Sequence, residues 1–256
     1  MDPAFMVLGL VVGTLVGMTG VGAGSLVTPA LVMSGVPPVV AVGTDLAYAA
    51  VSKSFGALVH GMRRTLDLRI AGLLAAGSVP AAALTIGVLS ASGGHAHSGL
   101  VTMALAMALI LTALALLAGR ARVAALASRY EARIAPVRAL LTVVAGAVLG
   151  TLVTVSSVGA GALGAVLLVA LHPSMPAARI AGVDIAHAVP LTLVAGFGHF
   201  WLGNVDLALA LNLLAGSVPG IVVGSLLAGR FSDLLVRRLL AFVLLCAGVR
   251  LAFADL

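Results

Sequence analysis

Long apolar segments separated by short polar connections dominate this chain. Eight segments are nearly free of charged residues, and most have the length of a bilayer-spanning helix, which needs about 20 apolar residues. They cover residues 5–34, 38–60, 70–92, 98–118, 139–171, 178–202, 207–228 and 237–253. The connections are rich in Gly, Pro, Ser and Asn, which form turns. This pattern predicts an all-α polytopic membrane protein with about eight hydrophobic segments.

Two of the segments, 5–34 and 139–171, are too long for one straight span. Each contains a glycine-rich stretch near its middle, at residues 19–25 in the first and 156–162 in the second. Glycine weakens a helix and allows the backbone to turn. We therefore expect both segments to be broken there and to fold back like hairpins.

The two breaks belong to an internal repeat. Residues 21–24 match residues 158–161 at an offset of 137, and residues 76–80 match residues 215–219 at an offset of 139. At the second offset the aligned residues are Pro37 with Pro176, Gly43 with Gly182, Asp45 with Asp184, His60 with His199, and Asp67 with Asp206. Charged residues are scarce in this chain, so these matches indicate a duplication. It predicts two transmembrane repeats, 1–118 and 139–256, joined by a linker at 119–138.

The arginines indicate how the two repeats are oriented, because basic residues in short loops mark the cytoplasmic side. Eight straight spans would divide the loop arginines between the two sides. If both broken segments fold back, all of these arginines become cytoplasmic. They are Arg63, Arg64, Arg69, Arg120, Arg122, Arg129, Arg133, Arg138, Arg179, Arg230, Arg237 and Arg238. We therefore favour inverted repeats and a cytoplasmic linker over eight straight spans.

The glycine breaks are the first candidate site. A broken helix exposes backbone N–H groups inside the membrane, and the N-terminus of a half-helix attracts anions. Inverted-repeat transporters bind substrate at such paired breaks. The candidate substrate-binding residues are Thr19, Gly20, Gly22, Gly24, Ser25, Ser156, Ser157, Gly159 and Gly161. Helix packing is the alternative, and it is the favoured interpretation for the ridge of Gly9, Gly13 and Gly17. A packing role predicts that Gly22→Ala and Gly159→Ala impair folding, whereas a site role predicts a folded protein without transport.

Charged residues inside the apolar segments are the second candidate, because an ionised group there costs about 2.5–3.5 kcal/mol. Lys53 is the only lysine of the chain and would favour an anionic substrate. Thr44 is a further candidate for substrate binding. Asp45, Asp184 and His187 are candidates for proton coupling. Structural roles stay open, either as a pair of Lys53 with Asp45 or as aspartates that cap a half-helix. His60 and His199 are interpreted as interfacial polar ends of their segments.

Composition excludes several other classes of protein. The chain is 62% hydrophobic and 9% charged, and its basic residues lie in short clusters between apolar segments, which does not favour nucleic-acid binding. The sequence contains no nucleophile with an adjacent base and no phosphate-binding glycine loop, so we predict no enzyme and no cofactor. The pair of His95 and His97 lacks further ligands nearby, and we predict no metal site.

Several of these motifs resemble a known family. Residues 20–24 followed by Pro29, residues 41–45 and His60 are similar to the TauE/SafE sulfite-exporter family of bacterial membrane proteins, and residues 156–162 resemble its repeated signature. The resemblance covers nearly the whole chain. It implies a transporter of sulfur-containing anions such as sulfite, sulfoacetate or related organosulfonates, driven by the proton gradient. Val183 stands where the first half has Thr44, so the two half-sites are not expected to be equivalent.

Together these features predict a multi-pass protein of the cell inner membrane that exports a small sulfur-containing anion as a secondary transporter. The expected partners are the anionic substrate and the lipid bilayer, and a homo-oligomer is compatible with the sequence. An anion channel, a transporter of another small solute and a non-catalytic membrane assembly partner are the alternatives.

Overall fold

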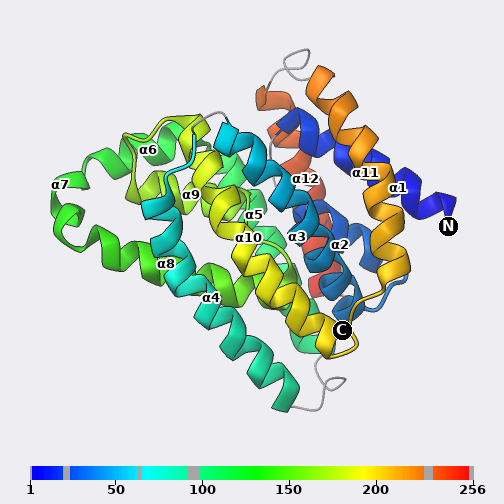
Figure 1. The fold of residues 1–256 in the computed structure, drawn as a ribbon. Coiled ribbons are helices and arrows are strands. Elements are labelled where there is room, and N and C mark those ends of the chain that lie inside the picture. Colours follow the sequence, from blue (N-terminus) through cyan, green and yellow to red (C-terminus); the bar gives the residue numbers. More distant parts are fainter. Residues whose placement is uncertain (1, 20–23, 63–64, 92–97, 228–232, 254–256) are drawn as a thin grey trace.

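The computed structural model describes residues 2–19, 24–62, 65–91, 98–227 and 233–253, and within them the chain is helical without a strand (Figure 1). The helices are α1 (Pro3–Thr19), α2 (Gly24–Met33), α3 (Pro38–Met62), α4 (Leu68–Ala91), α5 (Ser98–Ala118), α6 (Arg120–Ser128), α7 (Glu131–Ile134), a 3-10 turn η1 (Ala135–Val137), α8 (Arg138–Ser156), α9 (Ala162–Leu171), α10 (Ala177–Trp201), α11 (Leu207–Leu227) and α12 (Asp233–Ala252). Every predicted apolar segment is helical, so the all-α membrane fold is confirmed.

Large apolar side chains cover much of the outer surface, as in a protein whose solvent is lipid. Leu84, Phe197, Trp201 and Leu226 are all exposed. By length and composition, five stretches of the described chain can cross a membrane: Leu68–Ala91, Gly99–Ala118, Glu131–Ser156, Ala177–Trp201 and Leu207–Gly224. Two buried hydroxyls inside these helices are satisfied within the helix: Thr112 and Thr192 donate to the carbonyls of Ala108 and Ala188 four residues earlier.

The two long apolar segments are both broken, as predicted. The first is divided into α1 and the ten-residue α2, and the second into α8 and the ten-residue α9. A helix of ten residues rises only about 15 Å, half the thickness of the hydrocarbon core. Neither α2 nor α9 can therefore cross the membrane alone.

The helix directions show that the chain turns back at the first break. Gly9 faces Leu213, and Gly13 faces Ser217, so α1 and α11 run in the same direction. A short connection reverses the chain between α10 and α11, and α10 is antiparallel to α3. Helices α1 and α3 therefore run in the same direction, and α2 must return the chain to the side from which α1 started. Helix α8 packs parallel to α4, so by the same reasoning α8 and α10 run in the same direction. Helix α9 must therefore return the chain to the side from which α8 started.

Close glycine contacts repeat between the two halves with the same offsets as the sequence. Gly77 of α4 packs against the backbone of Val143 and Ala147 in α8, and Gly216 of α11 packs against that of Met6 and Leu10 in α1. These are equivalent positions, since each pair is separated by 137 or 139 residues. Each half thus lays its first helix against the fourth helix of the other half, which gives the molecule an approximate twofold pattern of contacts.

Helices α3 and α10 occupy equivalent places in the two halves and lie side by side at the centre of the molecule (Figure 1). Gly43 near the start of α3 faces the carbonyl of Asn204, just after the end of α10. Gly182 near the start of α10 faces the carbonyl of Thr65, just after the end of α3. These equivalent helices are therefore antiparallel, the arrangement that two oppositely oriented repeats require.

The linker is helical and packs on one end of the helix bundle. It contains α6, α7 and η1, and α6 lies against α9. The Arg120 guanidinium donates to the carbonyl of Met175 in the α9–α10 connection at 2.9 Å. Arg138 forms an ion pair with Glu131 at 3.2 Å. The linker therefore shares a face with the α9–α10 connection, which eight straight spans would place on the other side of the membrane.

Candidate functional site

Three residues with positive φ form the break between α8 and α9. Ser157 follows α8 in the left-handed conformation with φ 57°, and Gly159 and Gly161 have φ of 130° and 138°. A side chain at either glycine would be strained, because L residues rarely adopt these angles. Helix α9 then begins at Ala162, with Gly161 as its N-cap. Both glycines are thus needed for the backbone conformation of the break.

The carboxyl group of Asp45 joins three helices at the centre of the protein. Asp45 lies in α3 and is fully buried. Its Oδ2 accepts a hydrogen bond from Thr28 of α2 at 2.5 Å and another from Ser157 beside α8 at 2.9 Å. Its Oδ1 has no hydrogen-bond partner among the described residues. Buried carboxyl groups need partners, so the second oxygen is a ready acceptor for a proton donor or a polar ligand.

Lys53 connects α3 of the first half to the break of the second half. Its Nζ donates to the carbonyl of Ala160 at 3.1 Å, and its charge interacts with the carboxyl groups of Asp184 and Asp45. Asp184 lies in α10, where the backbone N–H of Gly161 is directed at its carboxyl group. The break therefore brings one cation and two acids together, and Asp184 sits at the N-terminus of α9 as a capping residue would.

His187 adds a titratable group to this cluster. It lies three residues after Asp184 on α10, is fully buried, and is close enough to Lys53 for an electrostatic interaction. Neither of its ring nitrogens has a hydrogen-bond partner within the described part of the chain. A buried imidazole with two unused nitrogens can take up or pass on a proton, the chemistry that proton coupling needs.

His199 and His60 differ from each other although their positions are equivalent. His199 is buried, not interfacial as predicted, and its Nε2 lies 2.9 Å from the carbonyl of Thr154 in α8. His60 lies near the end of α3, where its Nδ1 is 2.7 Å from the hydroxyl of Thr65. The interfacial interpretation is therefore wrong for His199, because α8 of the second half covers the end of α10.

Two predicted hydroxyls point away from the cluster and serve the backbone. The buried Thr44 accepts a hydrogen bond from the backbone N–H of Asp206 at 3.0 Å and so holds the α10–α11 connection. Ser156 donates to the carbonyl of Leu152 at 2.7 Å, within its own helix. Among the predicted hydroxyls of the second break, only Ser157 reaches a charged group, Asp45.

The predicted residues of the first break are described only in part. Gly20 and Gly22 lie outside the described residues, as do His95 and His97. Thr19 is the last residue of α1, and Gly24 is the first of α2. Ser25 is buried. Thr28, in the second turn of α2, donates its hydroxyl to Asp45.

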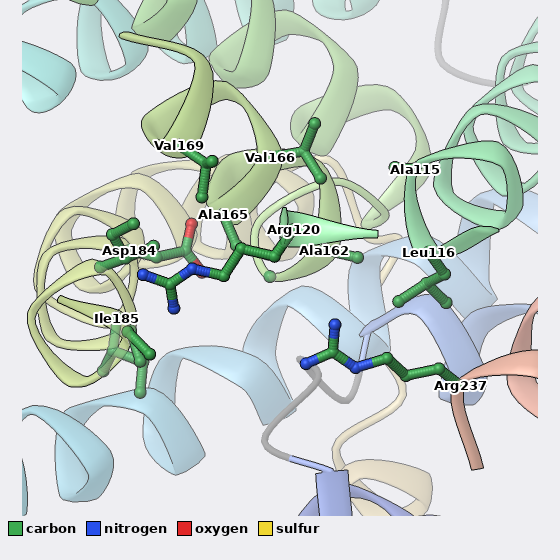
Figure 2. Close-up of a pocket in the computed structure, with 14 residues that line it drawn as sticks. Ala115, Leu116, Arg120, Ala162, Ala165, Val166, Val169, Asp184, Ile185 and Arg237 are labelled. Carbon is green, nitrogen blue, oxygen red and sulfur yellow. The ribbon is translucent and has the colours of Figure 1, made fainter. Parts of the chain in front are cut away.

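A pocket of about 250 Å³ leads from the second break toward the end of the bundle where the linker lies. Gly161 and Asp184 form part of its wall, and Arg120 and Arg237 extend into it from α6 and α12 (Figure 2). Most of the remaining wall is made of small aliphatic side chains. The pocket thus joins a charged cluster inside the membrane region to an arginine-rich face.

Sequence reasoning did not identify Thr28, Arg120 or Arg237 as residues of a site. Thr28 carries no signal, because a threonine in an apolar segment most often bonds to its own helix. The two arginines were interpreted only as markers of the cytoplasmic side.

Comparison with known proteins agrees with this architecture. The family described as sulfite exporter TauE/SafE matches residues 5–251. The probable membrane transporter protein YjnA of Bacillus subtilis (strain 168) is 37% identical over 254 residues, which cover 98% of this chain and 100% of that protein. No solved structure matches significantly.

Proposed function

Because the chain belongs to the TauE/SafE sulfite exporter family and is a multi-pass membrane transporter, we propose that it exports sulfite or a related small organosulfonate as a secondary transporter. The proposed place is the inner membrane, with the arginine-rich face toward the cytoplasm, as the positive-inside rule expects. The proposed driving force is the proton gradient.

One observation carries this proposal: Lys53 of the first half reaches the break of the second half, between Asp45 and Asp184. A charged group in the membrane interior is costly and usually functional. Here the charged residues lie at a helix break, where the backbone dipoles of α9 have their N-terminal end. In inverted-repeat transporters, discontinuous helices bind substrate in this way near the bilayer midplane.

The proposed roles follow from the charges. The Lys53 ammonium and the N-terminus of α9 favour an anion. Asp184 lies beside both and shares the positive charge of Lys53, which makes it the proposed proton carrier. After the anion has left to the outside, Asp184 would take up a proton there and release it to the cytoplasm, as export driven by an inward proton gradient requires. His187, three residues away, is the proposed second proton acceptor.

We also propose that the two repeats are inverted, because the antiparallel packing of α3 and α10 and the returns of α2 and α9 are what inverted copies require. Alternating access would then rock the helices that pack around one break against those around the other.

Counterflow in proteoliposomes tests the proposed function. Vesicles loaded with unlabelled sulfite should accumulate labelled sulfite transiently, because a transporter returns from the trans side faster with substrate bound. A channel would show no trans-stimulation. The same assay repeated with sulfoacetate, taurine, sulfate and chloride identifies the substrate. No anion-dependent flux, together with no thermal stabilisation of the purified protein by any of these anions, would contradict an anion transporter.

A further inference from the structure

The first repeat is closed at the place where the second repeat has its pocket. Three partly exposed side chains of the pocket beside Asp184 have counterparts beside Asp45 at the offsets of the repeat. All three counterparts are fully buried. The pairs, with the pocket residue first, are Ala165 with Thr28, Ala181 with Val42, and Ile185 with Leu46. Equivalent places in the two halves therefore differ in their accessibility.

These two places lie toward opposite faces of the protein. Asp45 stands seven positions after Pro38, the first residue of α3, and Asp184 stands seven positions after Ala177, the first residue of α10. Each aspartate is therefore about 10 Å along its helix, and the two helices are antiparallel. Helix α10 begins at the α9–α10 connection, which contacts the linker. The protein is thus open beside Asp184 toward the linker face, and closed beside Asp45 toward the other face.

Two hydrogen bonds hold the closed side together. Asp45 of α3 accepts one from Thr28 of α2 at 2.5 Å and one from Ser157 of the second break at 2.9 Å. The carboxyl group therefore ties α3 to both broken segments, one from each repeat. On the open side Ala165 stands in place of Thr28 and has no hydroxyl to donate to Asp184. The bond from α2 is therefore a feature of the closed side alone.

Tyr48 lies behind these bonds, one turn after Asp45 in α3. It is the first-half counterpart of His187, which follows Asp184 in the same way. Tyr48 is fully buried, and its neighbours include the hydroxyls of Ser52 and Ser217. Both serines donate to backbone carbonyls, and at the present distances the Tyr48 hydroxyl forms no hydrogen bond with a described residue. Its proton is therefore available to an acceptor that enters from outside.

We propose that Asp45, Thr28 and Ser157 form an outer gate, and that opening this gate exposes an external anion site at Tyr48. This inference rests on the proposed function as a transporter. Helix α2 is too short to span the membrane, so it can move away from α3 once its bond to Asp45 is broken.

The chemistry of Tyr48 suits the release of an oxyanion. A phenol hydroxyl donates one hydrogen bond to a sulfite or sulfonate oxygen and adds no charge. Neutral donors bind an oxyanion about half as strongly as charged donors such as the Lys53 ammonium. An anion that passes from Lys53 to Tyr48 is therefore held less tightly on the side where export releases it.

A cysteine behind the gate reports on its opening. Val42→Cys in a Cys246→Ala background places a thiol of similar size at a buried position beside Asp45. A small membrane-impermeant methanethiosulfonate added outside right-side-out vesicles should react slowly with it. Thr28→Val should raise this rate about tenfold, because the closed state loses one hydrogen bond to a charged group. Thr28→Ser keeps the hydroxyl and should react at the original rate. Thr112→Val is the matched control, since its buried hydroxyl donates within its own helix.

The external site is tested by Tyr48→Phe, which removes one oxygen and keeps the ring. Half-saturating concentrations of sulfite and ethanesulfonate are measured on each face with right-side-out and inside-out vesicles. The outer value should rise about fivefold, the effect of one lost hydrogen bond, and the cytoplasmic value should not change. Tyr130→Phe should change neither value, because this second tyrosine of the chain is exposed in the linker.

Each other outcome contradicts part of the proposal. An unchanged rate in Thr28→Val, or an equal rise in Thr112→Val, would rule out the gate. No effect of Tyr48→Phe, or equal effects on both faces, would show that the hydroxyl does not contact the outgoing anion. Counterflow by the wild type would leave the proposed function intact in all these cases. If Thr28→Val does not fold, Ser157→Ala removes the other hydrogen bond to the same oxygen and carries the same expected rise.

Discussion

The carboxyl groups of Asp45 and Asp184 occupy equivalent positions in the two repeats but have different surroundings. Asp45 receives two hydroxyl groups, from Thr28 and Ser157. Asp184 receives a backbone N–H at the start of α9 and lies on a pocket that leads out of the protein. Hydroxyl donors hold a carboxylate in place, whereas access to a pocket allows exchange of protons and ligands. At the scale of residues, Asp45 is therefore suited to structure and Asp184 to coupling.

Asp184→Asn tests this division of roles. The amide cannot take up a proton, so we expect the variant to lose transport driven by a pH gradient while counterflow at equal pH persists. Asp206→Asn is the control, because Asp206 accepts a hydrogen bond from the backbone N–H of Leu209 at the start of α11. It should keep the response to the pH gradient. Gradient-driven transport by Asp184→Asn at the wild-type rate would contradict proton coupling at this residue.

Ser157 combines a left-handed backbone with a hydrogen bond to Asp45, and two substitutions separate these properties. Ser157→Ala loses the hydrogen bond and keeps the strain, whereas Ser157→Gly loses the bond and relieves the strain. We expect the glycine variant to be more stable than the alanine variant by about 1 kcal/mol. Thermal unfolding in detergent measures the difference. Equal stabilities would show that the break does not impose this conformation.

At the scale of helices, the glycines act in two different ways. Gly159 and Gly161 are required for positive φ at the break, whereas Gly9 and Gly13 allow α1 to approach α11. The packing interpretation of Gly9 and Gly13 is thereby confirmed. Loss of transport in Gly159→Ala no longer separates a site from a structural role, because alanine at φ 130° strains the fold in either case.

Gly77 and Gly72 of α4 offer a matched pair for helix packing. A methyl group at Gly77 would collide with the backbone of Val143 in α8, while one at Gly72 would meet no atom. Gly77→Ala should therefore lower the free energy of unfolding by about 1–3 kcal/mol. Gly72→Ala should be neutral or stabilising, since alanine favours helix more than glycine. Unfolding temperatures of the two purified variants check this, and equal values would argue against close contact of α4 with α8.

The sequence predicts where helices lie better than which helices meet. Hydrophobic length and glycine runs located both breaks, because these signals are local. The exchange of partners, α1 with α11 and α8 with α4, could not be predicted, since Gly77 and Gly216 carry no information about which backbone they approach. The aligned aspartates indicated the cluster around Lys53, but its contact with Ala160 depends on how the two repeats dock.

At the scale of the whole molecule, the broken helices determine the topology. Because α2 and α9 return the chain to the side from which it came, the linker and the α9–α10 connection meet at one face, where Arg120 contacts Met175. The same returns make α3 and α10 antiparallel and place a charged cluster between them. The proposed site depends on this topology.

Sided labelling of single cysteines is therefore the most direct test of the account. Cys246 is the only cysteine, so a Cys246→Ala background can receive Ser128→Cys in the linker, Ser174→Cys between α9 and α10, or Ser34→Cys between α2 and α3. All three serines are exposed. A membrane-impermeant maleimide should label positions 128 and 174 in inside-out vesicles and position 34 in right-side-out vesicles. Labelling of positions 128 and 174 from opposite sides would mean that the second break does not turn the chain back, and it would contradict inverted repeats.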